Sequence, residues 1–224
     1  MTFWRQAIEI ARVDLVVERR VGDTLTITLP FAVIALIVFP VAAGSNANQV
    51  SEVGTAVFWA LGVLFGMHVA LRHTAADDQG RRDLQILLGV DPAARFVGRT
   101  ISGGILMLGF FVVLAFASAV LLSPDVSEGG WPLIVGVLAL VALGLTELGT
   151  LAGEITAGLR HRTALASLIV APLALPLVIG ASQSVEALER DTGILVWVLL
   201  LITSDLALAV AGVALAKPLE EATR

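Results

Sequence analysis

The chain has 224 residues, of which 57% are hydrophobic and only 15% charged, and its mean hydropathy is +0.92. A soluble domain of this length could not bury that much apolar surface, so the composition excludes an ordinary water-soluble protein. The net charge of -5 gives no sign of nucleic-acid binding, and the lack of cysteine excludes disulfides, thiolate catalysis and zinc–thiolate sites.

An amphipathic segment, residues 1–22, comes first along the chain. Its apolar stripe repeats at helical spacing and consists of Trp4, Ile8, Ala11 and Leu15. Charged residues such as Arg5 and Arg12 occupy another face, as in a helix that lies in the membrane surface. The segment is either a simple anchor or an elbow helix that links a transporter's membrane domain to movements below it.

Six apolar runs follow, and each is close to the roughly 20 residues that a membrane-spanning helix needs. They cover residues 25–44, 53–71, 101–122, 131–153, 163–181 and 193–216. The sequence therefore predicts an all-α integral membrane protein with a six-helix transmembrane domain at residues 23–216 and a tail at residues 217–224. Because residues 1–22 precede the first run, we expect that run to stay in the mature protein rather than to be cleaved as a signal peptide.

Positive charge falls almost entirely on one side of these predicted spans. Every Lys and Arg except Arg190 lies before the first span, between the second and third, between the fourth and fifth, or after the sixth. Cytoplasmic loops hold an excess of these residues, so both termini are predicted to be cytoplasmic. Trp59, Trp131 and Trp197 fall near the proposed outer ends, at the depth that tryptophan rings favour.

The longest cytoplasmic loop is predicted at residues 72–99. Its charged stretch ends at Asp83 and is followed by an apolar cluster that comprises Leu84, Ile86, Leu87 and Leu88. Such a pattern favours a docking helix, although a solvated connector with incidental leucines has the same pattern. Pro92 is expected to end this helix, because proline lacks an N–H donor and disfavours helix in the preceding Asp91.

Ionisable residues also occur inside the predicted spans. Glu147 and Glu154 are seven residues, or about two turns, apart in the fourth, and Asp205 lies in the sixth. A charge at the bilayer centre costs roughly 2.5 to 3.5 kcal/mol on insertion scales, so these acids should face protein or water, or be protonated. They predict either a polar seam inside a bundle or dimer, or a proton or cation path.

The histidines and prolines of the spans each have two interpretations. His68, in the second span, is either a polar packing residue or an axial ligand for haem iron, and His73 and His161 are expected to be interfacial cations. Pro172 and Pro176 predict a kink or local unwinding of the fifth span, which is common both in structural helices and in helices that line a path.

Motifs for catalysis within this chain are missing from the sequence. The lysine of a Walker A loop has no equivalent, because Lys217 is the only lysine and is followed by a proline. The H-E-x-x-H and G-x-S-x-G motifs are also absent. The sequence therefore indicates that the chain is not an enzyme, and any ATP hydrolysis would belong to a partner.

Taken together, these residues resemble the CcmB family, the permease of bacterial cytochrome c maturation, also called haem exporter protein B. The resemblance extends from about residue 3 to about residue 187 and rests on Phe3-Trp4-Arg5, Asp14-Leu15, Glu18-Arg19, Trp59, Phe65-Gly66-Met67, Ala76-Asp77, Gln79-Gly80, Asp83, Leu87, Gly98-Arg99, Gly144, Gly149-Thr150, Arg160, Arg162, Pro172 and Pro176. The order of these features, rather than any single one, carries it. The chain departs from the family pattern at Gly89, where a proline is common, at Arg99, usually lysine, and at Glu147 and Glu154, usually small and apolar.

The resemblance implies an ABC-2-like permease in the bacterial inner membrane. Two copies would assemble with two CcmA-like ATPase subunits, which bind ATP and magnesium, and with CcmC-like and CcmD-like membrane proteins. ATP hydrolysis would drive either haem export or release of the haem-loaded chaperone CcmE, so haem is a possible substrate and no cofactor is expected on this chain. The residues predicted to dock the ATPase are Asp83, Leu84, Leu87, Leu88 and Arg95, with Arg72 and Arg99 fixing the loop ends at the membrane.

Two alternatives stay open at this point. One is an ABC-2 permease for another substrate, such as a lipid, glycan or drug. The other is a proton-coupled secondary transporter that uses Glu147, Glu154 and Asp205.

Overall fold

The computed structural model describes residues 2–21, 23–43, 47–75, 79–122, 130–156, 162–190 and 192–222. Within these ranges the chain is helical and contains no strand. In chain order the helices are α1 (Phe3–Val21), α2 (Asp23–Ala43), α3 (Ala47–Ala75), α4 (Gln79–Leu87), α5 (Pro92–Leu122), α6 (Trp131–Ile155), α7 (Arg162–Leu173), α8 (Leu175–Glu189) and α9 (Leu195–Ala222). The predicted all-α fold is confirmed.

Four of the described helices, α3, α5, α6 and α9, are long and apolar enough to cross a bilayer unaided. Two bent helix pairs meet the same criterion together, α1 with α2 at a bend of 70° and α7 with α8 at a bend of 45°. The structure therefore holds four to six candidate spans, as expected for a multi-pass membrane protein. The predicted spans at residues 25–44 and 163–181 fall on α2 and on α7 with α8.

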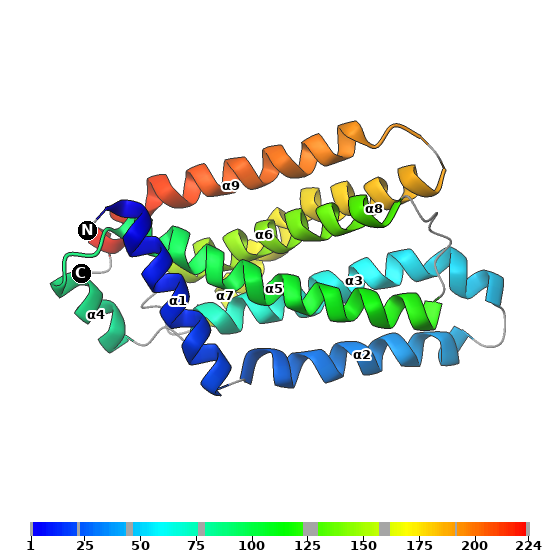
Figure 1. The fold of residues 1–224 in the computed structure, drawn as a ribbon, viewed down its shortest axis with the longest axis horizontal. Coiled ribbons are helices and arrows are strands. Elements are labelled where there is room, and N and C mark those ends of the chain that lie inside the picture. The colour runs from blue at the N-terminus through cyan, green and yellow to red at the C-terminus, as the bar shows by residue number, and fades with distance from the viewer. Residues whose placement is uncertain are drawn as a thin grey trace.

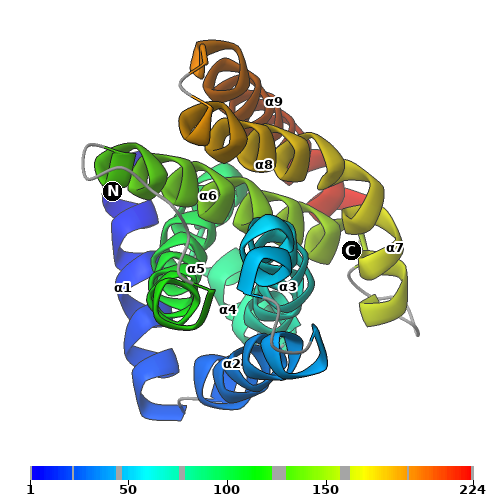
Figure 2. The ribbon, with the colours of Figure 1, turned by 90° about the vertical axis from the view of Figure 1, so that its right-hand side faces the viewer.

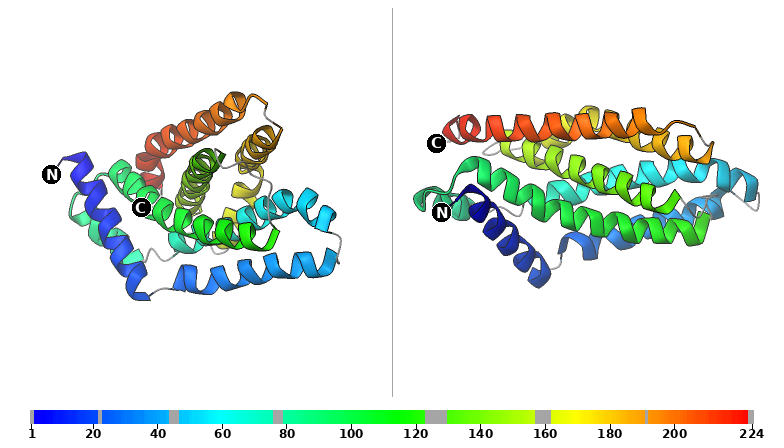
Figure 3. Two further views of the ribbon diagram at one scale, coloured as in Figure 1. Left: turned by 45° about the vertical axis from the view of Figure 1, so that its right-hand side comes forward. Right: turned by 45° about the horizontal axis from the view of Figure 1, so that its top comes forward.

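Most helices run side by side along the longest axis of the molecule (Figure 1). The central helix is α6, which contacts α3, α5, α7, α8 and α9. It lies between α3 and α5 on one side and α8 and α9 on the other (Figures 2 and 3). Its Gly149 is so close to Ala70 of α3 that a Cβ there would overlap the alanine. Because of this tight packing, a displacement of one neighbour of α6 is felt by the others.

Both chain termini and α4 lie at the same end of the bundle, which we call the α4 end (Figure 1). The helices α2 and α5 run from this end to the far end, and α3, α6 and α9 return. The described segments in which Lys and Arg are concentrated therefore lie at the α4 end. This is expected when successive spans cross the membrane in alternating directions and the positively charged loops lie on the same side.

The helix α1 crosses the bundle at the α4 end and packs mainly on α5. Ala7 and Ile10 approach α5 where Gly98 has no side chain; a Cβ on Gly98 would overlap the Ala7 carbonyl oxygen and Ile10. The predicted apolar stripe lies beside this contact, and Trp4 and Ile8 are 64% and 57% exposed. The helix thus has one apolar face for α5 and another that is free to enter a lipid surface.

The bend between α7 and α8 falls at Ala174, between Pro172 and Pro176. Backbone hydrogen bonding continues through it, since Ala174 N–H donates to the Val170 carbonyl at 2.8 Å. Pro176 stands in the first turn of α8, where its missing N–H would have no helical acceptor.

A glycine ends the loop helix, so the expectation that Pro92 does so is wrong. Gly89 has a φ of +67°, and the N–H groups of Gly89 and Val90 donate to the carbonyls of Ile86 and Gln85, the pattern of a Schellman C-cap. Pro92 instead opens α5, and Asp91 Oδ1 caps that helix by accepting from the Ala93 N–H at 2.9 Å. The proline rule applies to a helix interior, whereas the first position of a helix tolerates proline.

Candidate functional site

Buried polar side chains gather at the α4 end, on the first turns of α5. Arg95, Arg99 and Ser102 are spaced four and three residues apart, so they lie on one face of this helix. They are 4%, 4% and 0% exposed. Buried charges of this kind require partners from neighbouring helices.

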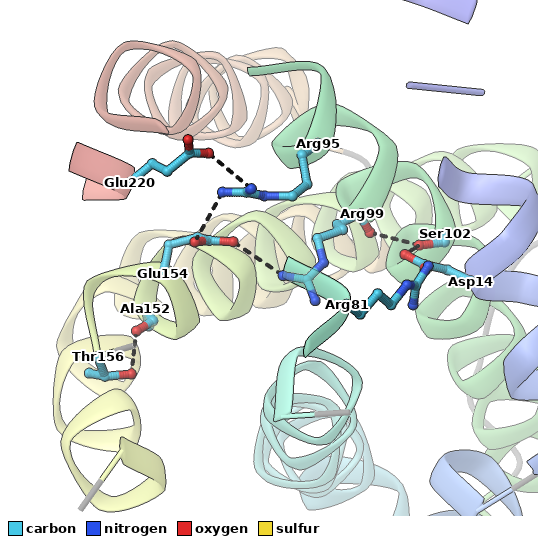
Figure 4. Close-up of polar contacts among 9 residues, drawn as sticks. All are labelled: Asp14, Arg81, Arg95, Arg99, Ser102, Ala152, Glu154, Thr156 and Glu220. Carbon is cyan, nitrogen blue, oxygen red and sulfur yellow. Dashed lines mark hydrogen bonds and ion pairs between the residues drawn. The ribbon is translucent and has the colours of Figure 1, made fainter. Parts of the chain in front are cut away.

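The two arginines find those partners on α6 and α9 (Figure 4). Arg99 Nη1 donates to Glu154 Oε1 at 3.1 Å, and Arg95 Nη1 donates to Glu220 Oε2 at 3.0 Å. Arg95 Nη2 also lies 3.9 Å from Glu154 Oε2, so the four residues form one continuous run of alternating charge. This run joins α5, α6 and α9.

A second set of contacts joins α1, α3 and α4 to the same face of α5. Arg81 of α4 forms an ion pair with Asp14 of α1 (Figure 4). Ser102 Oγ lies 3.4 Å from Asp14 Oδ2 and 3.3 Å from His73 Nε2 of α3. We call the whole set the arginine network; it consists of Asp14, His73, Arg81, Arg95, Arg99, Ser102, Glu154 and Glu220.

The segment between α4 and α5 is held to α1 at a further point. The backbone N–H of Asp91 donates to the Gln6 side-chain oxygen at 3.2 Å. Together with the Arg81–Asp14 ion pair, this bond attaches both α4 and the turn that follows it to α1, and α1 in turn packs on α5. The helices α1 and α4, the α4–α5 turn and the start of α5 are thus connected to one another at the α4 end, and we refer to them as one unit.

Part of the outer surface of this unit, on α4 and the turn after it, is apolar. Leu84, Leu87 and Leu88 are 57%, 84% and 71% exposed, and we call them the leucine patch. Beside it is an open cleft of about 470 Å³ between the α4–α5 turn and the end of α9. The cleft is lined by Ile86, Gly89, Val90, Asp91, Pro92, Lys217, Glu220 and Glu221.

The residues predicted for the loop thus divide into two groups. The leucines are on the surface, whereas Arg95 and Arg99 are inside the arginine network, so contact between Arg95 and a separate protein would require its ion pairs to open. Arg72 is half-buried in the last turn of α3. Asp83 belongs to α4, but its side chain lies outside what the structure describes.

The intramembrane residues also separate in space. Glu154 belongs to the arginine network, while Glu147 and Asp205 lie deeper in the bundle and are 3% and 4% exposed. His68 is exposed on the surface of α3, and no group of three metal-ligating side chains occurs among the described residues. His73 is not the predicted interfacial cation, because α5 packs over it and leaves it 8% exposed. His161 lies outside the described residues.

Arg81, Ser102 and Glu220 are not among the site residues predicted from the sequence, and Asp14 enters there only through the family resemblance. Glu220 is 125 residues from Arg95, and Asp14 is 67 residues from Arg81. One general rule could have drawn attention to these residues: a charge buried in a membrane protein needs an opposite charge beside it. The rule points to acids at the ends of apolar helices, but it does not say which arginine each acid contacts.

The family model described as CcmB protein matches residues 5–222 of this chain. The chain belongs to the CcmB family. Among CcmB relatives, the protein named Heme exporter protein B of Haemophilus influenzae (strain Rd) is 26% identical over 182 residues, which cover 80% of this chain and 81% of the relative. The resemblance expected from the sequence is confirmed, and the CcmB match extends beyond residue 187 through α9, including Glu220.

Proposed function

We propose that this chain is the permease subunit of an ABC-type complex for cytochrome c biogenesis in the bacterial cytoplasmic membrane. A separate ATPase would supply the energy, either for haem export or for release of a haem-loaded CcmE chaperone. Membership of the CcmB family supports the permease assignment, and the name of the Haemophilus relative supports haem as the transported or handled compound. ATP and magnesium belong to the ATPase in this proposal.

The leucine patch is the observation that carries the proposal. It stands at the end of the bundle that has both termini and most of the described Lys and Arg, which the positive-inside rule places in the cytoplasm. Neighbouring exposed apolar side chains mark a contact site for a protein or a membrane, and on the cytoplasmic side of a permease we take the partner to be a protein. We therefore assign Leu84, Leu87 and Leu88 to a groove on a CcmA-like ATPase, with Asp83 setting the register.

Motion of the docked ATPase would enter the bundle through contacts that surround the patch. The Arg81–Asp14 pair and the Gln6–Asp91 hydrogen bond attach α4 to α1, so α1 acts as the elbow helix. Arg99 and Arg95 continue the route to Glu154 on α6 and Glu220 on α9. Arg72 and Arg99 would hold the two ends of the loop at the membrane surface.

The complete complex in this proposal contains two copies of the chain, two ATPase subunits, and CcmC-like and CcmD-like membrane proteins. The proposed arrangement has residues 1–22 as the elbow, residues 23–216 as the permease domain and residues 217–224 as a cytoplasmic tail. Association with these partners distinguishes the proposal from an ABC-2 permease for a lipid, glycan or drug.

The proposal is tested by combining Asp83→Ala with Leu87→Ala in cells that depend on this chain for c-type cytochromes. We expect the chain to accumulate normally while cytochrome assembly falls. ATP hydrolysis by the complex should continue but no longer be coupled to cytochrome assembly. Leu195→Ala is the matched control, because Leu195 is also exposed, at 68%, but begins α9 at the far end. Cytochrome levels that are unchanged in the double variant would refute the docking assignment.

A further inference from the structure

Two acidic side chains face each other inside the bundle, apart from the arginine network. Glu147 of α6 and Asp205 of α9 are 3% and 4% exposed. Asp205 fits against α6 because Gly144 has no side chain; a Cβ on that glycine would overlap Asp205 Oδ1. Gly144 is one turn from Glu147, so the two carboxyls approach each other across the α6–α9 interface. They are near enough to interact electrostatically.

Three of the four carboxyl oxygens of this pair have no hydrogen-bond partner among the described residues. Glu147 Oε2 and both oxygens of Asp205 accept no hydrogen bond from any described residue. The hydroxyl of Thr150, one turn along α6 from Glu147, is also buried without a partner. Two ionised carboxylates in these apolar surroundings would repel each other with no counter-charge nearby.

Other ionisable groups on the surrounding helices do not supply that charge. On α5, Arg95 and Arg99 are bound to Glu220 and Glu154 at the α4 end. The acids of α8 lie in its last turns, toward the far end, and the described side chains of α7 include no ionisable group. Among the described side chains of α3 and α9, the remaining ionisable groups are His68, which is exposed, and Arg72, His73, Lys217, Glu220 and Glu221, which belong to the last turns of their helices.

We infer that Glu147 and Asp205 form an intramembrane proton-binding pair, in which at least one carboxyl is protonated while α6 and α9 are packed as they are here. Carboxyl groups that share a site retain a proton because both cannot ionise together. A proton also fits the pair better than a divalent metal, which takes six or more oxygen ligands or a shell of water.

The pair makes the α6–α9 contact sensitive to protonation. Loss of the shared proton leaves like charges on the two helices, so proton release is coupled to their separation or to entry of water or a cation. Glu154 is a contrasting case on the same helix, since it is also buried but is bound to Arg99 and Arg95. This inference is independent of the docking of an ATPase.

A carbodiimide such as dicyclohexylcarbodiimide tests the inference, because it reacts with protonated carboxyl groups in apolar surroundings. Native membranes that contain the full chain are labelled at several pH values, and the adducts are located by mass spectrometry. We expect an adduct on Glu147 or Asp205 that is lost as the pH rises, and several-fold less on Glu154. If sodium but not choline suppresses the adduct at constant pH, a cation competes with the proton at this pair, as expected when proton release is coupled to cation entry. An adduct on Glu147 or Asp205 whose yield does not change with pH overturns the proton assignment.

Infrared spectroscopy of the purified chain covers the case in which the reagent cannot reach the pair. The band of a protonated carboxyl is expected at neutral pH and should be lost in the combined Glu147→Gln and Asp205→Asn variant, whose amides imitate the protonated forms. Glu154→Gln should leave the band unchanged. A wild-type spectrum identical to that of the double variant in this region would overturn the proposal.

Discussion

Removing one side of the Arg99–Glu154 ion pair should destabilise the protein strongly. Both side chains are at most 10% exposed, and their charged atoms are 3.1 Å apart. Breaking a buried ion pair by deleting one partner typically costs about 3 to 5 kcal/mol, because the other charge is left uncompensated. Arg99→Gln should therefore lower the free energy of unfolding by about 3 kcal/mol, the lower end of this range, since Arg95 remains 3.9 Å from Glu154.

The double variant separates loss of the pair from loss of packing. Arg99→Gln combined with Glu154→Gln leaves neutral groups that can hydrogen-bond, so we expect it to recover most of the stability lost in Arg99→Gln alone. Unfolding is followed by circular dichroism in mixed micelles with increasing sodium dodecyl sulfate. A loss of less than about 1 kcal/mol in the single variant, or strictly additive losses in the double variant, would show that the network is not a coupled buried structure.

Two further predictions concern the attachment of α1. Gly98→Ala should destabilise the α1–α5 contact by about 1 to 3 kcal/mol, because the new Cβ overlaps the Ala7 carbonyl oxygen. Gly104→Ala, on the same helix with no neighbouring atom within 4 Å, should be neutral or slightly stabilising, and thermal unfolding of the two variants measures the difference. Arg81→Ala should leave the Asp14 carboxylate buried without its ion pair and make α1 easier to cleave in limited proteolysis, with the exposed Arg5→Ala as the control. If Gly98→Ala and Gly104→Ala are equally stable, the close contact between Gly98 and Ala7 is contradicted. If Arg81→Ala and Arg5→Ala are cleaved equally, the Arg81–Asp14 ion pair is contradicted.

The sequence predicts the helices well because apolar length and charge alternation are local properties. The spans at residues 53–71, 101–122, 131–153 and 193–216 correspond to α3, α5, α6 and α9, and the loop leucines are exposed. The ends of the loop helix are a different matter. Gly89 and Pro92 are both helix-terminating residues, and pattern alone does not reveal that one closes α4 while the other opens α5.

The polar contacts are harder to predict because they depend on which helix faces meet. Periodicity places Arg95 and Arg99 on one face of α5 but does not reveal that Glu154 and Glu220 lie opposite them. It also does not show that α5 covers His73, which from its position beside Arg72 resembles a surface cation. Glu147 and Asp205 signal a polar site from the sequence, and only the structure brings them together across Gly144.

The central claim, that the leucine patch receives an ATPase, is tested most directly by cross-linking from Leu87. The natural chain has no cysteine, so Leu87→Cys introduces a unique attachment point for a photoreactive group, and Leu195→Cys provides the same at the far end. In native membranes, we expect the Leu87 probe to yield an adduct that contains a peptide of a CcmA-like ATPase, and the Leu195 probe to yield none. Absence of the ATPase from the Leu87 adducts, or its equal recovery from both positions, would contradict the account.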